Sequence, residues 1–299
     1  MKRLILMTGI IALFYQASVA QNLMDLLNED SVKTTEYTYA TFFADRIVLG
    51  QSIENPPKGA LVFVISHHFG PVNSGPYDFF GLDQANIRFG FEYGFNDWFA
   101  AGIGRSSVYK TYDGFLKFKI LRQSKGLRNM PFSLTYWTNI AITALKFQNP
   151  EQNSDFGSRM EYAHQLLIAR KFSEGISFQL TPTFIHRNLV ETKNDQNDVF
   201  AIGAGGRVKI SKRTSINAEY FYLLPGQTAD DFNNSFSVGV DLETGGHVFQ
   251  IFLTNSQGLL EEHFIPRTEG SWGNGFIRLG FNVNRTFQLK KPKLPTPGN

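Results

Sequence analysis

The stretch Ala85-Asn86-Ile87-Arg88-Phe89-Gly90-Phe91-Glu92-Tyr93-Gly94 decides the fold, because apolar and polar side chains alternate along its whole length. Odd positions carry Ala, Ile, Phe, Phe and Tyr, whereas even positions carry Asn, Arg, Gly, Glu and Gly. Successive side chains of a β-strand point to opposite faces, so this period of two predicts a strand with one apolar and one polar face.

The same pattern recurs along most of the chain. We expect strands at about 59–69, 85–94, 98–106, 112–121, 132–143, 158–171, 176–186, 198–210, 214–224, 234–242, 246–254 and 274–287. Most of these segments are nine to fourteen residues long. Such lengths suit tilted strands that cross a bilayer better than the strands of about 5–6 residues that are typical of globular proteins.

Short and long connections alternate between these segments. Tight turns are expected at 95–97, 173–175, 211–213 and 243–245, and longer loops at 70–84, 144–157, 187–197, 225–233 and 255–273. Connections 107–111 and 122–131 fit the alternation less well. The pattern predicts an all-β fold, an antiparallel transmembrane β-barrel of about 12 strands over residues 59–289. A soluble β-sandwich would show the same alternation, but strand length, the Gly/Arg/Glu/Asn face and aromatic strand ends favour the barrel.

The N-terminus has the pattern of an export signal. Lys2 and Arg3 precede an apolar run from Leu4 to Tyr15, and Ser18-Val19-Ala20 offers small residues for cleavage. We therefore predict a signal peptide at 1–20 and location in the bacterial outer membrane. Residues 21–58 form an N-terminal segment that could cap or plug the periplasmic mouth, and 290–299 form a disordered, proline-rich tail.

Composition excludes several classes of protein. The chain has 299 residues and no Cys, which excludes disulfides, thiolate metal sites and a Cys nucleophile. The net charge of +3 is too small and too evenly spread for a nucleic-acid-binding surface. The six His are not spaced for chelation, and we expect no metal and no cofactor.

The polar faces define a predicted lumen lining of mixed sign. Its charged members are Arg88, Glu92, Lys117, Lys119, Arg159, Glu161, Arg207, Lys209, Glu219, Asp241 and Arg278. Such a lining indicates either a channel or binding protein for a small polar solute or ion, or ion pairs that fill and stiffen a plugged barrel. In the second case the protein is structural or accessory and pairs with periplasmic proteins.

Loops offer further hypotheses. The Gly/Pro/aromatic loop 70–81 could fold into the extracellular mouth. A loop cluster of Asp78, Asp83, Arg105, Lys110 and Asp113 could bind an anion, although surface ion pairs bracing a turn are favoured. Ser66 and His68 share a strand face, so an outer-membrane lipid hydrolase is a distant alternative, and no enzyme activity is predicted.

Five runs carry a family resemblance: 46–52 (RIVLGQS), 65–70 (ISHHFG), 80–88 (FGLDQANIR), 102–107 (GIGRSS) and 110–117 (KTYDGFLK). They resemble a domain-of-unknown-function family of membrane-bound outer-membrane β-barrel proteins of Gram-negative bacteria. The resemblance implies fold and location and brings no activity. The partners to expect are outer-membrane lipid and the barrel-insertion machinery.

Overall fold

The computed structural model describes residues 34–146, 155–229 and 232–290. The predicted signal peptide at 1–20 and residues 291–299 of the predicted tail lie outside them. Two compact units are distinguished. The smaller unit pairs β1 (Thr35–Tyr37) with β6 (Ser124–Gly126) in an antiparallel ribbon that the sequence pattern did not reveal.

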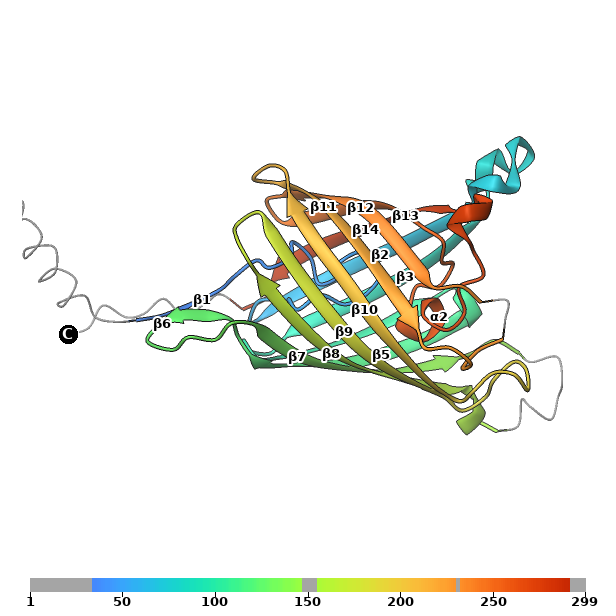
Figure 1. Cartoon of the computed structure of the whole chain (residues 1–299), viewed down its shortest axis with the longest axis horizontal. Coiled ribbons are helices and arrows are strands. Elements are labelled where there is room, and N and C mark those ends of the chain that lie inside the picture. Colours follow the sequence, from blue (N-terminus) through green and yellow to red (C-terminus); the bar gives the residue numbers. More distant parts are fainter. Residues whose placement is uncertain (1–33, 147–154, 230–231, 291–299) are drawn as a thin grey trace, which may run out of the picture. The chain divides into compact units, whose positions relative to one another are not determined.

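The larger unit is a closed barrel of twelve strands, which confirms the predicted fold class. Figure 1 shows the tilted strands side by side. They are β2 (Ala60–Pro71), β3 (Ala85–Gly94), β4 (Phe99–Ser106), β5 (Thr111–Leu121), β7 (Ser133–Thr143), β8 (Met160–Lys171), β9 (Ile176–Arg187), β10 (Asp198–Lys209), β11 (Thr214–Leu223), β12 (Ser235–Thr244), β13 (His247–Thr254) and β14 (Arg278–Gln288).

Every barrel strand pairs antiparallel with its neighbours, and the ring closes between β14 and β2. Closure leaves no unpaired sheet edge, which a lipid environment requires because lipid offers backbone groups no hydrogen-bond partner. A β-bulge interrupts the register between Lys119 and Leu121, near the end of β5.

Side chains sort by the alternation that the sequence shows. Phe89, Phe91 and Ile103 point outward and are exposed, whereas Arg88, Glu92 and other polar neighbours point inward and are buried. The barrel therefore has an apolar outer surface and a polar lumen, which is the arrangement found in membrane-spanning barrels.

The two ends of the barrel differ. At the short-turn end, β3–β4, β8–β9, β10–β11 and β12–β13 are joined through residues 95–98, 172–175, 210–213 and 245–246. The long-loop end carries the short helices η1 (Val72–Ser74), η2 (Pro76–Gly81), η3 (Val108–Lys110), η5 (Gly157–Arg159), α2 (Glu261–Phe264) and η6 (Trp272–Asn274). Among the described residues, no helix has the length and apolar character needed to cross a membrane.

Candidate functional site

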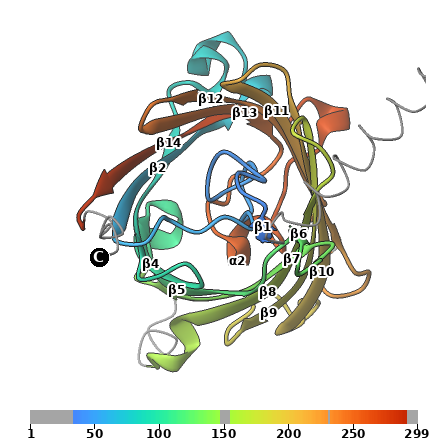
Figure 2. The same cartoon turned by 90° about the vertical axis from the view of Figure 1, so that its left-hand side faces the viewer.

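The barrel lumen contains a short hairpin from the segment that precedes β2. We call residues 44–53 the lumen hairpin. Its two arms are joined by an antiparallel β-bridge between the backbones of Arg46 and Gln51. The Ile47 N–H donates to the Gly50 carbonyl at 2.9 Å, and the Ser52 N–H donates to the Asp45 carbonyl at 2.8 Å. The end-on view of Figure 2 shows this chain, in blue, inside the ring of strands.

A single carboxylate of the barrel wall holds the tip of the lumen hairpin. Glu219 of β11 accepts hydrogen bonds from the backbone N–H groups of Val48 (3.2 Å), Leu49 (2.6 Å) and Gly50 (3.1 Å). Gly50 is needed here because a Cβ at this position would lie 2.8 Å from the Phe221 ring. The carboxylate thus satisfies three buried donors that the hairpin turn leaves unpaired.

Neutral amide side chains hold the rest of the hairpin. Asn282 donates to the Val48 carbonyl at 2.9 Å, Gln179 to the Gln51 carbonyl at 2.8 Å, and Gln250 to the Ile47 carbonyl at 3.2 Å. These donors come from β14, β9 and β13, so the hairpin is gripped from several sides of the barrel. Its apolar side chains Ile47, Val48 and Leu49 are buried.

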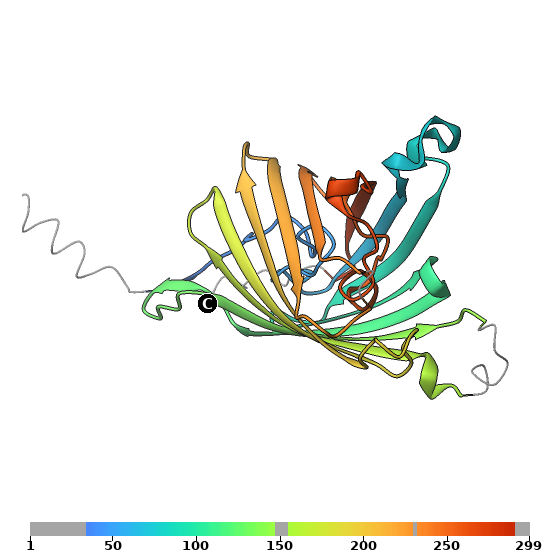
Figure 3. The same cartoon turned by 45° about the vertical axis from the view of Figure 1, so that its right-hand side comes forward.

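A second element enters the lumen from the long-loop end. We call residues 255–268, between β13 and β14, the inner loop; it contains α2. Phe264 is buried and packs edge-on against Phe221 with ring centroids 5.2 Å apart. Asn139 of β7 donates to Glu262 at 2.7 Å. In Figure 3, α2 lies among the strands at the long-loop end.

The inner loop is held further by an arginine clamp. Arg267 makes a bidentate ion pair with Glu161 of β8, with N···O distances of 2.6 and 2.9 Å. Such two-bond pairs are short and directional, so they fix the loop in one position.

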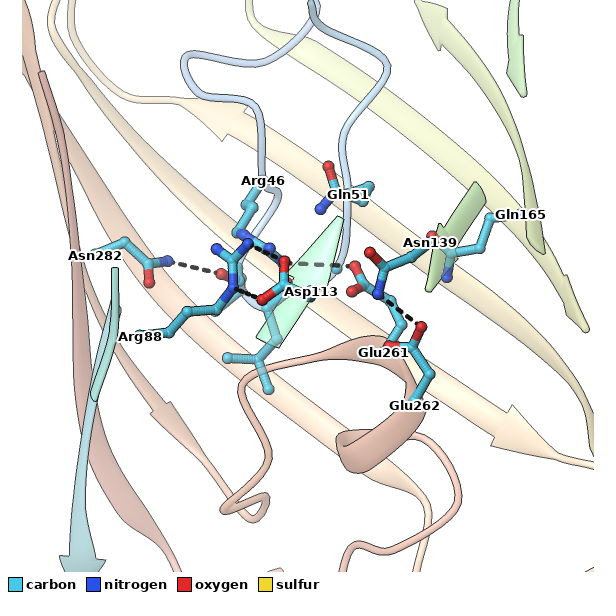
Figure 4. A network of polar contacts seen from close by, with 12 residues as sticks. Arg46, Gln51, Arg88, Asp113, Asn139, Gln165, Glu261, Glu262 and Asn282 are labelled. Carbon is cyan, nitrogen blue, oxygen red and sulfur yellow. Dashed lines mark hydrogen bonds and ion pairs between the residues drawn. The ribbon is translucent and has the colours of Figure 1, made fainter. Parts of the chain in front are cut away.

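The two lumen elements touch each other. Arg46 of the lumen hairpin lies 3.4 Å from Glu261 of the inner loop, and its guanidinium also donates to the Leu49 carbonyl at 2.5 Å. Figure 4 shows this contact beside the Arg88–Asp113 pair and the Asn139–Glu262 bond. The segments from opposite ends of the barrel therefore form one polar network.

Burial controls the charge of the α2 carboxyls. It raises the pKa of Glu262 well above the usual value, and neighbouring Glu261 raises it further. Burial also raises the pKa of Glu261, whereas nearby Arg46 lowers it. Glu262 is therefore favoured in its neutral, hydrogen-bonding form.

Most of the predicted lumen lining does face inward. The buried members are Arg88, Glu92, Lys117, Arg207, Glu219, Asp241 and Arg278. Glu219 is the member that grips the lumen hairpin, Lys117 donates to the Glu54 carbonyl, and Gln250 donates to Asp241 at 3.0 Å. The lining thus serves partly to hold the segment that precedes β2 and partly to form bonds within the barrel wall, as Arg88 does with Asp113.

The remaining predicted members lie nearer the barrel ends. Lys119 is half-buried beside the β5 bulge, and Lys209 lies 5.3 Å from the Phe43 ring centroid. Arg159 belongs to η5 rather than to β8 and donates to the Leu145 carbonyl at 2.7 Å. Glu161, half-buried, pairs with the inner loop as described above.

The predicted loop cluster is not assembled. Asp113 points into the lumen and forms a bidentate pair with Arg88 at 2.5 and 3.0 Å, whereas Arg105 is exposed and lies over the outward Tyr112 ring. Asp83 and Lys110 are exposed on separate connections, and Asp78 is half-buried in η2. Neighbouring positions on a strand face opposite sides, so proximity in sequence did not bring these charges together.

The expectation that loop 70–81 enters the mouth is wrong. Tyr77 is 94% exposed and Phe79 60% exposed, and the loop, cyan in Figure 1, extends away from the strands. The inner loop enters instead. A signal for it exists in the sequence, because the apolar pairs Leu259-Leu260 and Phe264-Ile265 lie within the connection predicted as a long loop at 255–273.

Ser66 and His68 are both buried on the lumen side of β2, and His68 packs edge-on against Phe252 at 5.4 Å between ring centroids. This position is turned away from the outer surface where lipid lies. In the part of the chain that the structure describes, no three His, Asp or Glu side chains are grouped to hold a metal ion.

Cavities lie at both ends of the inserted segments. One of about 320 Å³ at the long-loop end is lined in part by inner-loop residues His263 and Arg267. Another of about 300 Å³ at the short-turn end is lined by Phe42, Phe43 and Asp45 among others.

Residues 42–287 match the family described as membrane bound beta barrel domain (DUF5777). The chain belongs to this family, which confirms the resemblance noted in its N-terminal third. No curated protein matches the chain.

Solved barrels show limited similarity. The NanC porin aligns with a TM-score of 0.47 and 7% identity over 76% of this chain and 98% of its own. The KdgM porin aligns at 0.44 and 8% over 76% and 98%, and LpxR from Salmonella typhimurium at 0.34 and 10% over 76% and 99%. At these values no binding property or activity is transferred to this chain.

Proposed function

We propose that this membrane-bound β-barrel is an outer-membrane channel for a small polar solute or ion, and that the lumen hairpin closes it at rest. The observation that carries the proposal is the grip of Glu219 on the backbone of residues 48–50. In this proposal the predicted signal peptide directs export, and outer-membrane lipid surrounds the apolar outer face.

The character of the contacts supports a movable closure. The wall holds the hairpin mainly through side chains that bond to backbone groups, such as Asn282 and Gln179. Water can replace neutral hydrogen bonds of this kind at small net free energy, about 0.5–1.5 kcal/mol each. Withdrawal of the hairpin would leave a lumen lined by polar and charged side chains, as conduction of a polar solute requires.

A plugged accessory barrel is the second candidate. It is favoured by the Arg46–Glu261 contact, because this contact joins the lumen hairpin to the inner loop in one network. In that case the barrel stays sealed, and its short-turn end is the surface for a periplasmic partner. No catalytic step is part of either proposal.

Single-channel current in planar bilayers tests the proposal. A Leu49→Cys/Asn282→Cys pair would tie the hairpin to β14, because both residues line the same small cleft. The chain has no Cys, so a bis-methanethiosulfonate cross-linker would react only with the introduced pair. Each single-Cys variant is the control for modification without a cross-link.

We expect intermittent stepwise current from the wild type, none from the cross-linked pair, and recovery after reduction. More frequent openings are expected from Glu219→Ala. If the wild type, Glu219→Ala and a variant lacking residues 38–53 all insert and all remain sealed, the channel proposal fails and the accessory barrel takes its place.

A further inference from the structure

The cavity at the long-loop end has walls from β5, β7, β8, the connection after β9 and the inner loop. Its volume of about 320 Å³ lies at the lower end of the range for small-molecule sites. The lining residues include Tyr109, Glu161, Glu191, His263 and Arg267.

The charged groups in and beside the cavity carry one excess negative charge, because Glu161, Glu191 and Asp195 are opposed by Arg267 and by Arg187, which lies 3.9 Å from Asp195. Arg267 is committed to Glu161 at 2.6 and 2.9 Å and to the Glu262 carbonyl at 3.1 Å. Its Nε lies 3.3 Å from Glu191 Oε1, and the Glu191 side chain is 53% exposed. Two carboxylates thus share one guanidinium, and the outer carboxylate can accept further hydrogen bonds.

His263 adds a buried acceptor. The residue is 3% exposed, and its Nδ1 has no hydrogen-bond partner among the described residues. Burial lowers the pKa of His263 to about 4, so the imidazole is neutral at pH 7 and one of its ring nitrogens accepts. A buried imidazole without a partner is costly unless a ligand or water bonds to it.

Tyr109 is held against His263 in a strained backbone conformation. The two rings meet edge-on at 5.1 Å, and Tyr109 has a φ of 49°, a left-handed value uncommon for a residue with a large side chain. Strain of this kind persists where the surrounding structure fixes it and is concentrated at binding sites. The phenol oxygen can both donate and accept.

The remainder of the wall is apolar. Ala141, Leu145, Leu189 and Val190 line the same cavity. A ligand that fits it therefore combines a cationic donor with a short hydrocarbon body.

We propose that this cavity binds a small primary ammonium ion with an apolar body, held by Glu191, Tyr109 and His263. An ammonium group has three donors for these three acceptors, and its charge balances the excess carboxylate. An anion would meet two carboxylates, and Arg267 is already turned toward them, with Nη1 and Nη2 bonded to Glu161 and Nε 3.3 Å from Glu191. The inference names the solute class of the proposed channel. Binding of the ammonium ion does not require conduction, but its role as a transported solute rests on the proposed function.

The test is a ligand-observed NMR titration of the full chain, refolded in detergent micelles, with n-butylammonium as the probe. n-Butanol and n-butyrate have the same chain length with no charge and with the opposite charge. We expect saturable binding of butylammonium at least about tenfold tighter than that of either control ligand. Equal affinity for butanol, or no saturable binding of butylammonium, would overturn the proposal.

Variants locate the site. Glu191→Gln removes the charge from a half-exposed residue, and Tyr109→Phe removes one acceptor; each should weaken butylammonium binding, the first by about tenfold or more. Glu174→Gln is the matched control, because Glu174 is an exposed carboxylate at the short-turn end, 2.9 Å from Lys171. Unchanged affinity in both Glu191→Gln and Tyr109→Phe would reject this cavity as the site.

The binding readout is independent of conductance. Binding in a barrel that never conducts would reject the channel and retain the ammonium site. Conductance without butylammonium binding would retain the channel and reject the site.

Discussion

The lumen hairpin and the inner loop occupy the same barrel but are held in different ways. The hairpin is gripped through its backbone by Glu219 and by neutral amides such as Gln250. The inner loop is clamped through its own charged side chains, chiefly Arg267 on Glu161. The inner loop is also joined to a barrel strand at each of its two ends. The lumen hairpin is joined to a barrel strand only at its C-terminal end.

This difference in contacts decides which of the two elements can move. Withdrawing the hairpin bares Ile47, Val48 and Leu49, but most of its bonds to the wall are side-chain bonds to backbone groups, which water can replace. Withdrawing the loop separates the bidentate Arg267–Glu161 ion pair and bares the buried Phe264. Removing one member of a buried ion pair costs about 3–5 kcal/mol. We therefore expect the hairpin to be the gate and the loop a fixed part of the barrel.

The largest effect is expected from breaking the clamp on the loop. Arg267→Ala leaves the Glu161 side chain, which is only 14% exposed, without its partner and should lower stability by about 3 kcal/mol. The measurement is the urea midpoint for unfolding in micelles. Glu174→Ala is the control, since it removes the exposed partner of the Lys171 ion pair and should change the midpoint little. Equal shifts in the two variants would contradict the assigned role of the clamp.

The second-largest effect is expected from removing the hydrogen bonds that Glu219 accepts from the hairpin. Glu219→Ala removes three charge-assisted hydrogen bonds and should favour hairpin withdrawal by about 2 kcal/mol, or about thirtyfold in equilibrium. A Ser52→Cys reporter, fully buried in the closed barrel, would then react faster with a water-soluble maleimide.

Asn217→Ala is the matched control on the same strand, because Asn217 gives the hairpin one bond of 3.4 Å, to the Ile47 carbonyl, and also accepts a bond from Ser215 of the wall. It should accelerate labelling only a few fold. If both variants label Ser52→Cys at the wild-type rate, Glu219 does not hold the hairpin closed.

The contact between the two elements should contribute less. A double-mutant cycle of Arg46→Met and Glu261→Gln, read by the same labelling rate, should give a coupling of about 1 kcal/mol across the 3.4 Å contact. Additive effects would show that the hairpin moves without regard to the loop.

The pH dependence of stability tests the burial of Glu262 in the inner loop. The pKa of Glu262 is raised on folding, so the unfolded chain releases this proton first and stability falls as pH rises above about 4.5. Glu262→Gln keeps an acceptor for Asn139 without the charge. The variant should be more stable than wild type at pH 8 and equal to it near pH 4, by thermal unfolding. A pH-independent difference would contradict the raised pKa.

The smallest effect is expected from the outer loop. Replacing residues 72–83 by a short Gly/Ser linker should leave conductance and Ser52→Cys labelling unchanged, because Tyr77 and Phe79 point away from the barrel. A change in either would mean that this loop contributes to closure after all.

The sequence by itself determined the barrel. Alternation such as that of Ala85–Gly94 follows directly from the two faces of a strand, and strand length reflects the thickness that a strand must cross. For that reason the strands appear within a few residues of their predicted bounds, and Arg88, Lys117 and Glu219 point inward as their position in the alternation requires.

The sequence suggested residues 21–58 as a cap or plug, but only the tertiary structure decided which residues fill the barrel. Residues 44–53 and 255–268 have no periodicity that fixes their position, because their partners lie on strands far away in sequence, as with Val48 and Glu219 or Arg46 and Glu261. The Asp113 side chain, predicted in a loop cluster with Arg105 and Lys110, faces the lumen instead, and its pairing with Arg88 depended on how neighbouring strands align across the barrel wall. Local pattern sets the direction of a side chain, but the register and closure of the whole sheet set what that side chain meets.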